Sequence, residues 1–170
     1  MNLDTTAFTG KLKFFLRKKK KRQSFVKKLY FSLGTMTVKN GKYPPESAGR
    51  KMIANVPTAL PSATIADLPN KLFKKAKDFE TLNYVYILDQ EGRLVGVLSL
   101  KDVFQKPEEN IIGKGLMMTD VIKVRPHTDQ EKVAILALKH NLKSIPVTDK
   151  ENVFLGVVPS DVILEILHSE

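Results

Sequence analysis

Two stretches of this chain, each of about 50 residues, follow the same pattern. Each runs through a Met-headed segment, a helix-start pattern, a helix, two strands joined by an acidic turn, and a second helix. The aspartates that open the two turns, Asp89 and Asp149, are 60 residues apart, and so are Gly96 and Gly156 in the strands that follow. The spacing predicts two copies of one β-α-β-β-α unit.

The copies differ in length at one place. The prolines ahead of the first helix of each copy, Pro61 and Pro126, are 65 residues apart, so the first copy has five extra residues between that helix and its hairpin. After each proline, at residues 64–67 and 128–131, a threonine stands three residues before a carboxylate, which predicts a capping box. The predicted strands are residues 84–88, 94–99, 144–148 and 153–158, and the predicted helices include residues 133–142, a short helix from Lys101 and residues 161–167.

A unit of this size buries little core by itself, so we expect the two copies to pack sheet against sheet as a pseudo-two-fold pair. The expected fold class is therefore α/β (α+β), which the apolar fraction of 42% suits. The chain has no cysteine, which excludes disulfides, zinc-thiolate sites and thiol nucleophiles and suits a reducing interior. No apolar stretch approaches the roughly 18 residues that a membrane helix needs.

Positive charge is concentrated at the N-terminus. Residues 1–50 contain 13 Lys and Arg against two acidic residues, a net charge of +11, whereas residues 51–170 carry 15 against 16. We therefore divide the chain into a basic arm at residues 1–42, a first repeat with its lead-in segment at 43–110, and a second repeat at 111–170. Six consecutive cations form the centre of the arm and are its predicted polyanion contact: Arg17, Lys18, Lys19, Lys20, Lys21 and Arg22.

The arm has three alternative interpretations. Repulsion between like charges favours a solvated, disordered tail. Apolar residues with helical spacing at 25–33 favour an amphipathic helix on an anionic membrane surface, where each cation contributes about 1 kcal/mol. A lysine run also neutralises nucleic-acid phosphates without needing a fold, and this is the less favoured third interpretation.

The first repeat ends in a motif that is typical of a known family. Residues 96–102 read Gly, two apolar residues, Ser, two variable residues and Asp, which resembles the signature of cystathionine-β-synthase (CBS) domains. The pair of repeats therefore resembles a Bateman module of two CBS domains. Residues 46–52, Glu-Ser-Ala-Gly-Arg-Lys-Met, are similar to the segment that leads into the CBS pair of MgtE-type magnesium transporters. Further similar segments are residues 84–86, 92–97 and 128–131, and the resemblance extends over residues 43–168.

The chain also departs from that family's pattern. The resemblance implies an acidic domain before the CBS pair and a connecting helix and membrane domain after it, whereas here a basic arm precedes the pair and the sequence ends at Glu170. Two hypotheses stay open. One is a ligand-sensing regulatory module of a magnesium transporter, in which nucleotide or Mg²⁺ biases a membrane gate, and the other is a stand-alone adenylate-binding protein that its arm tethers to a membrane or nucleic acid.

The resemblance also implies partners and a location. We expect a homodimer through the CBS helices, a membrane transport domain in the same or another chain, and a cytoplasmic location, at the inner face of the cell membrane. No Gly-rich phosphate loop, nucleophile elbow or paired-carboxylate motif is present in the sequence, so we expect no enzymatic activity.

An adenine nucleotide (ATP, ADP or AMP) is the expected ligand of the first repeat. A ribose diol is best held by a carboxylate, and a phosphate by hydroxyls, backbone N–H groups and cations. Asp102 is the predicted ribose ligand and Ser99 the predicted phosphate ligand, with Thr58 and the backbone around Tyr84 and Val85 enclosing the base. The alternative is that Ser99 merely caps a helix and Asp102 completes its capping box.

The second repeat is a weaker candidate for nucleotide binding. Its aspartate, Asp161, follows Gly156 by five residues, whereas Asp102 follows Gly96 by six. One residue of helix corresponds to about 100° of rotation, so Asp161 is not expected to point where Asp102 does if the strand registers agree. The residues of this weaker site are Lys123, Ile145, Pro146, Ser160 and Asp161.

A second role is open to Asp161. It lies four residues before Glu165, on the same predicted helix face, and Mg²⁺ is bound through one or two carboxylates that leave it several waters. A solvated helix face is the favoured alternative. The histidines His127, His140 and His168 lack the close spacing of a metal or acid-base site, so we expect surface roles for them.

Overall fold

The computed structural model describes residues 42–105 and 111–168. The six-cation run of the arm lies outside these residues. The first sheet has the strand order β1-β2-β3 and the second the order β4-β5. The strands are β1 (Thr58–Ala59), β2 (Tyr84–Leu88), β3 (Leu94–Ser99), β4 (Ser144–Thr148) and β5 (Phe154–Pro159), and the helices are α2 (Ala48–Lys51), α3 (Asp67–Lys75), α4 (Leu100–Gln105), α5 (Gln130–His140) and α6 (Ser160–His168).

The predicted strands are confirmed at residues 84–88, 94–99 and 144–148, and β5 begins and ends one residue later than predicted. β1 pairs with β2 in parallel, and the two hairpins are antiparallel. Each residue pair of the second hairpin matches a pair of the first hairpin whose residue numbers are lower by 60. Both ladders shift register at the same place, before their last pair. The duplication is therefore confirmed at the level of backbone pairing.

The helices differ from the prediction at their first turns. α4 and α6 each begin one residue earlier than predicted, directly after the preceding strand. At the second predicted capping box, the cap is Asp129, whose Oδ1 accepts from the Glu131 N–H at 2.8 Å. Thr128 does not cap α5, because its hydroxyl oxygen instead accepts from the Arg125 N–H at 3.0 Å and closes the preceding turn. In the first box, Asp67 Oδ2 accepts from both the N–H and the hydroxyl of Thr64.

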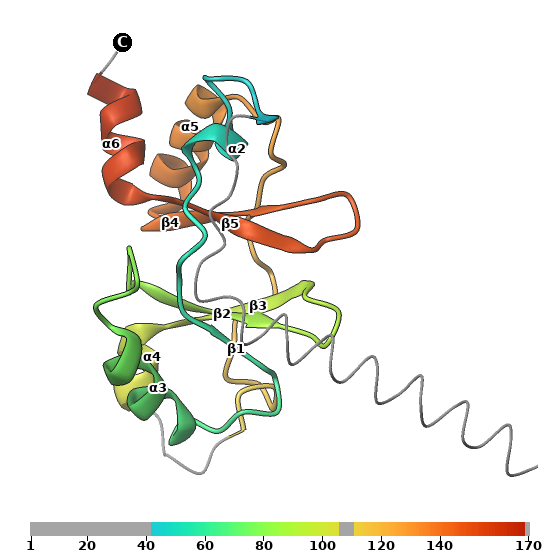
Figure 1. Ribbon diagram of the computed structural model, residues 1–170, viewed down its shortest axis with the longest axis vertical. Coiled ribbons are helices and arrows are strands. Elements are labelled where there is room, and N and C mark those ends of the chain that lie inside the picture. The colour runs from blue at the N-terminus through green and yellow to red at the C-terminus, as the bar shows by residue number, and fades with distance from the viewer. Residues whose placement is uncertain (1–41, 106–110, 169–170) are drawn as a thin grey trace, which may run out of the picture. The chain divides into compact units, whose positions relative to one another are not determined.

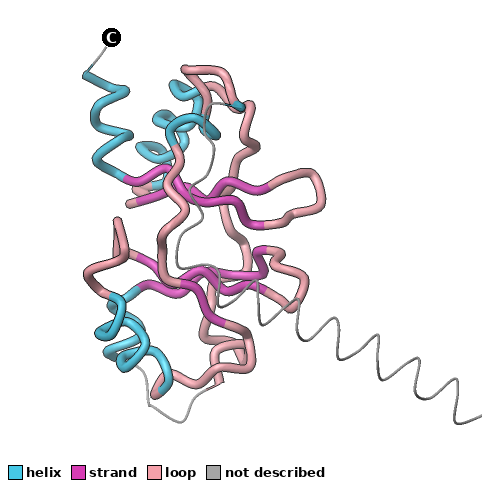
Figure 2. The backbone as a smooth tube through the Cα atoms, in the orientation of Figure 1, coloured by secondary structure: helices cyan, strands magenta, loops and turns pink. Residues whose placement is uncertain are grey.

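The sheets face each other and the helices lie on their outer sides (Figure 1). Figure 2 shows the strands as two neighbouring central layers with helices beyond each. Strand alternation explains this arrangement, because side chains on opposite faces of each sheet enter different cores. In β2, Val85 and Ile87 pack toward the helices, whereas Tyr86 and Leu88 pack toward the other sheet. The predicted sheet-to-sheet pair is thus confirmed.

The lead-in segment of the first repeat packs on the core of the second repeat. Ala48 is fully buried there, and its N–H donates to the Thr128 carbonyl at 2.8 Å. The Gly49 N–H donates to the Pro126 carbonyl at 2.8 Å. The boundary at residue 110 remains a prediction, but the second core depends on residues that precede the first repeat's strands.

Further backbone contacts join each repeat to the segment that leads into the other. Ile53 and Val157 exchange two hydrogen bonds of 2.8 Å, and Met118 and Val97 exchange two of 2.9 and 3.0 Å. Because Val157 is the counterpart of Val97, these contacts are related by the pseudo-two-fold.

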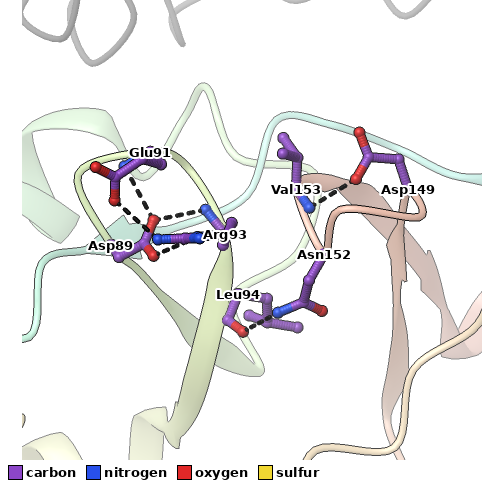
Figure 3. Close-up of polar contacts among 7 residues, drawn as sticks. All are labelled: Asp89, Glu91, Arg93, Leu94, Asp149, Asn152 and Val153. Carbon is purple, nitrogen blue, oxygen red and sulfur yellow. Dashed lines mark hydrogen bonds and ion pairs between the residues drawn. The ribbon is translucent and has the colours of Figure 1, made fainter.

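The tips of the two hairpins also bind each other (Figure 3). The Leu94 N–H donates to the Asn152 carbonyl, and the Phe154 N–H donates to the Gly92 carbonyl, each at 3.0 Å. Asn152, at the left-handed position that Gly92 holds in the first tip, adds a side-chain hydrogen bond of 2.7 Å to the Leu94 carbonyl. We call this contact the hairpin clasp.

Each turn of the clasp is closed by its first aspartate. Asp89 Oδ1 accepts from the N–H groups of Glu91 and Arg93, and Asp149 Oδ1 accepts from the equivalent amides, including that of Val153 at 2.8 Å. Partial burial raises the pKa of the Asp89 carboxyl, but the hydrogen bonds and charge of Arg93 outweigh it and hold this pKa below its usual value.

Substitution of Gly156 tests the contact between β5 and the lead-in segment. A Cβ added there would clash with the backbone carbonyl oxygen of Ile53, whereas one added at Gly96 would first meet the movable side chain of Met117, 2.6 Å from its sulfur. We expect Gly156→Ala to lower the free energy of unfolding by about 1–3 kcal/mol and Gly96→Ala to lower it less. Urea unfolding curves measure the free energy of unfolding of both variants. Equal losses would contradict the close contact between Gly156 of β5 and the backbone of Ile53.

Candidate functional site

Three of the predicted ligand residues lie at one end of the first sheet. Tyr84 begins β2 and is the direct partner of Ser99, the last residue of β3. Thr58 pairs with Tyr86 in the neighbouring strand β1. Since partners across a ladder share a face, Thr58, Tyr84 and Ser99 lie on the face that is turned toward the second repeat. The structure therefore brings these three residues together.

Ser99 and Asp102 are joined by two hydrogen bonds. The Ser99 hydroxyl donates to Asp102 Oδ2 at 2.7 Å, and its oxygen accepts from the Asp102 N–H at 3.1 Å. This is the capping geometry that the sequence offers as the alternative to ligand binding. Both side chains are partly exposed, and Oδ1 of Asp102 has no hydrogen-bond partner among the described residues. The pair thus holds its carboxylate in place at the end of β3.

Val85 contributes no side chain to this face. Its side chain is buried in the helix-side core, so its backbone alone remains a candidate for contact with a ligand. Tyr84 is half-buried, and its ring meets that of Tyr86 edge-on at a centroid distance of 6.4 Å. An aromatic ring beside a hydroxyl and a carboxylate suits a ligand with a flat base and a sugar.

The second repeat places different side chains at the equivalent positions. Because the registers agree, Pro159 and Val162 stand where Ser99 and Asp102 stand in the first repeat. Asp161 is exposed, one helical position away. The five residues of the predicted weaker site lie as follows. Lys123 is exposed ahead of the bridge at Val124, Ile145 is buried in the helix-side core, and Pro146 is buried opposite Val157. Ser160 and Asp161 begin α6.

Asp161 and Glu165 are both exposed on α6. In the part of the chain that the structure describes, no three His, Cys, Asp or Glu side chains gather in a way that could hold a metal ion. His127 is exposed and meets the ring of Tyr43 edge-on, at a centroid distance of 5.5 Å. Within residues 42–105 and 111–168, no helix has both the length and the apolar character to cross a membrane.

The structure adds one contact that the sequence did not indicate. The Tyr86 hydroxyl and Ser144 Oγ lie 2.6 Å apart across the interface between the repeats. The Tyr86 ring also stacks on Phe154 of the second sheet, with centroids 5.1 Å apart and planes inclined by 27°. Burial raises the pKa of the Tyr86 hydroxyl well above its usual value, which the hydrogen bond to Ser144 offsets in part. We call this contact the Tyr86 strut.

The fold and the paired repeats define a tandem CBS-domain protein, and comparison agrees with that class. The CBS domain family model matches residues 48–109 and 112–169, so the chain belongs to the CBS domain family.

Among curated proteins, the chain is similar to the magnesium transporters MgtE of Thermus thermophilus and Bacillus subtilis. The identities are 33% and 36% over 129 residues, which cover 76% and 75% of this chain and 28% of each transporter. The chain thus spans less than a third of the length of these relatives. Among solved structures, it is similar to the cytosolic domain of the Mg²⁺ channel MgtE in complex with ATP, with 32% identity and a TM-score of 0.72 over 75% of this chain and 51% of that one.

Proposed function

We propose that this chain is the regulatory, ligand-sensing CBS pair of a magnesium-transporter-like protein and binds adenine nucleotide at the end of the first sheet. The observation that carries the proposal is the Ser99–Asp102 pair, held on the same edge as Thr58 and Tyr84. The similar MgtE cytosolic domain was solved with ATP, which supports this ligand class. The second repeat has no such pair in the matching positions.

Each side chain has a defined role in this proposal. Asp102 accepts hydrogen bonds from the ribose hydroxyls through Oδ1 and, once the Ser99 hydroxyl has turned away, also through Oδ2. When nucleotide binds, the Ser99 hydroxyl turns toward the phosphate. A ribose hydroxyl then donates to Asp102 Oδ2 in place of Ser99. Tyr84 and Thr58 flank the base. No bond is made or broken, so the module acts as a sensor and not as an enzyme.

Nucleotide at this edge lies between the two sheets, so its binding alters how the repeats pack. In the proposed regulation, this change rearranges a homodimer and biases a membrane transport domain in the same or another chain, at the cytoplasmic side. Mg²⁺ is a proposed second signal, weakly held by the exposed carboxylates Asp161 and Glu165. The second candidate function, a stand-alone adenylate-binding protein, uses the same site and is favoured by the net charge of +11 in residues 1–50.

Asp102→Ala tests the nucleotide site. Removing a charged hydrogen-bond acceptor costs about 1.5–3 kcal/mol, so we expect affinity for ATP, ADP or AMP to fall at least about tenfold and to be lost at ordinary protein concentrations. Isothermal titration calorimetry measures the binding. The matched control is Asp161→Ala, which removes the exposed aspartate of the second repeat and is expected to bind as the parent does. If Asp102→Ala binds all three nucleotides as tightly as the parent, the site is wrong.

The homodimer is proposed through the helices of the second repeat. α5 is apolar on two sides: Val133 and Ala137 are buried, whereas Ile135 and Leu138 are 61% and 62% exposed. Leu164 on the neighbouring α6 is also exposed. A helix that is apolar on both faces is stable in water when both are covered. A second copy of the same face satisfies this need with two-fold symmetry.

Leu138→Lys is therefore expected to weaken dimerisation at least about tenfold, because it places a charge in the centre of the contact. Light scattering coupled to size-exclusion chromatography measures the mass. The matched control is Phe104→Lys, at a residue of the first repeat that is 61% exposed, and it is expected to remain dimeric. A parent chain that stays at 19.1 kDa at high concentration contradicts the dimer, and a dimeric Leu138→Lys contradicts its location.

The basic arm is proposed to contact anionic membrane. Six cations at about 1 kcal/mol each supply several kcal/mol at an anionic bilayer, and salt near 1 M screens this attraction because the Debye length falls to about 3 Å. We expect the full chain to sediment with anionic vesicles at low salt but not near 1 M salt. A chain that begins at Lys42 is expected not to sediment with them. Equal sedimentation of both chains would contradict the role of the arm. Binding to duplex DNA without binding to vesicles would show that nucleic acid, and not membrane, is the partner of the arm.

A further inference from the structure

The two repeats differ at two positions on the facing strands. Because the registers agree, Tyr84 and Tyr86 of β2 correspond to Ser144 and Pro146 of β4. All four lie on the faces that are turned toward the other repeat, by the alternation of each strand. The pseudo-two-fold therefore relates the Tyr86–Ser144 pair of positions to the pair formed by Pro146 and Tyr84.

Of these two position pairs, Tyr86 and Ser144 are joined by a hydrogen bond between their hydroxyls, whereas Pro146 has no side-chain group that could bond the hydroxyl of Tyr84. Tyr86 donates or accepts a hydrogen bond with Ser144 at 2.6 Å, and the residues are 1% and 3% exposed. Phe154 stacks on the same ring and holds it in place. Proline at position 146 has no hydroxyl, and Tyr84 is half-buried and not closed off from solvent. We call the end of the first sheet at Tyr84 and Ser99 the first edge, and the equivalent end of the second sheet at Ser144 and Pro159 the second edge. The first edge is thus accessible, and the second edge is covered.

We propose that Tyr86 closes the second repeat's counterpart of the candidate site, so that each chain takes nucleotide at the first repeat alone. The ligand in this statement rests on the proposed function. The closure is a property of the folded chain itself and is tested without any nucleotide.

The other side chains of the second edge agree with closure. Pro159 has no side-chain hydroxyl where Ser99 has one, and Val162 has no carboxylate where Asp102 has one. A tyrosine that fills the space between the sheets stabilises the pair through its ring and its hydrogen bond. Tyr86 also keeps Ser144 from contact with a ligand. The same side chain therefore stabilises the interface and closes the second edge.

The absence of cysteine from the chain allows a direct test of accessibility. Tyr84→Cys and Ser144→Cys each introduce one thiol at equivalent positions of the two repeats in the full chain. The reaction of each with 5,5′-dithiobis(2-nitrobenzoic acid) is followed in native buffer, with the rate in urea as the reference. We expect the thiol at position 84 to react at least tenfold faster than the thiol at position 144. Equal rates in folded proteins would overturn the closure.

The role of Tyr86 is tested in the Ser144→Cys background. Tyr86→Leu and Tyr86→Met keep an apolar side chain but remove the phenol, and each is expected to raise the thiol rate at position 144 at least threefold while circular dichroism shows a folded chain. A folded variant with an unchanged rate would overturn the assignment to Tyr86. If neither variant folds, the comparison of positions 84 and 144 decides alone.

Calorimetric stoichiometry separates this inference from the proposed function. With ATP, ADP or AMP, one equivalent per chain that Asp102→Ala abolishes supports both. Two equivalents, or one that persists in Asp102→Ala, overturn the closure. A parent chain that binds none of the nucleotides overturns the proposed function, while the thiol rates still decide whether the second edge is closed.

Discussion

The burial of the two facing sheet surfaces against each other is the interaction on which the rest of this structure depends. The shared cluster contains Val56, Tyr86, Leu88, Leu94, Val97 and Val157, from both repeats. A hairpin with one helix layer would leave the other, apolar face of its sheet in water, and an isolated two-stranded hairpin is at best marginally stable. The hairpin clasp and the Tyr86 strut both require this packing, because each joins atoms of different repeats.

The exchange of lead-in segments makes the two repeats inseparable as folding units. Ala48 and Met52, which precede the first repeat's strands, are buried in the helix-side core of the second repeat. In the same way Ile112, which precedes the second repeat's strands, is buried in the helix-side core of the first. Each core is therefore completed by a segment from the other side of the module. A change in the angle between the sheets has to move these segments.

The sequence predicted the features that depend on local pattern and missed those that depend on distant partners. The β-forming residues at 84–88 and the repeated order of elements were sufficient to predict β2 and β4. The Ser99–Asp102 spacing was sufficient to predict a linked pair, whichever role it has. The cap at Asp129 was missed because Thr128 is drawn into a turn by Arg125. The exchange of lead-in segments and the Tyr86 strut join residues that lie in different elements far apart in the sequence, such as Tyr86 and Ser144, which are 58 positions apart. No periodicity within one strand specifies such a partner.

Duplication gives the chain two equivalent sets of backbone positions that carry different side chains. The ladders of the repeats match pair by pair, so the backbone offers the same positions twice and the side chains alone distinguish them. A serine at the end of β3 has a hydroxyl that both donates and accepts, whereas the proline at the end of β5 has neither a donor nor a polar side chain. The first edge can therefore exchange an internal hydrogen bond for one to a ligand. The second edge has its hydroxyl, that of Ser144, already bound to Tyr86 from the opposite sheet, so that edge contributes rigidity to the interface. In the proposed function, a ligand at the first edge acts against this fixed second repeat, so that a small change at one edge turns one sheet relative to the other.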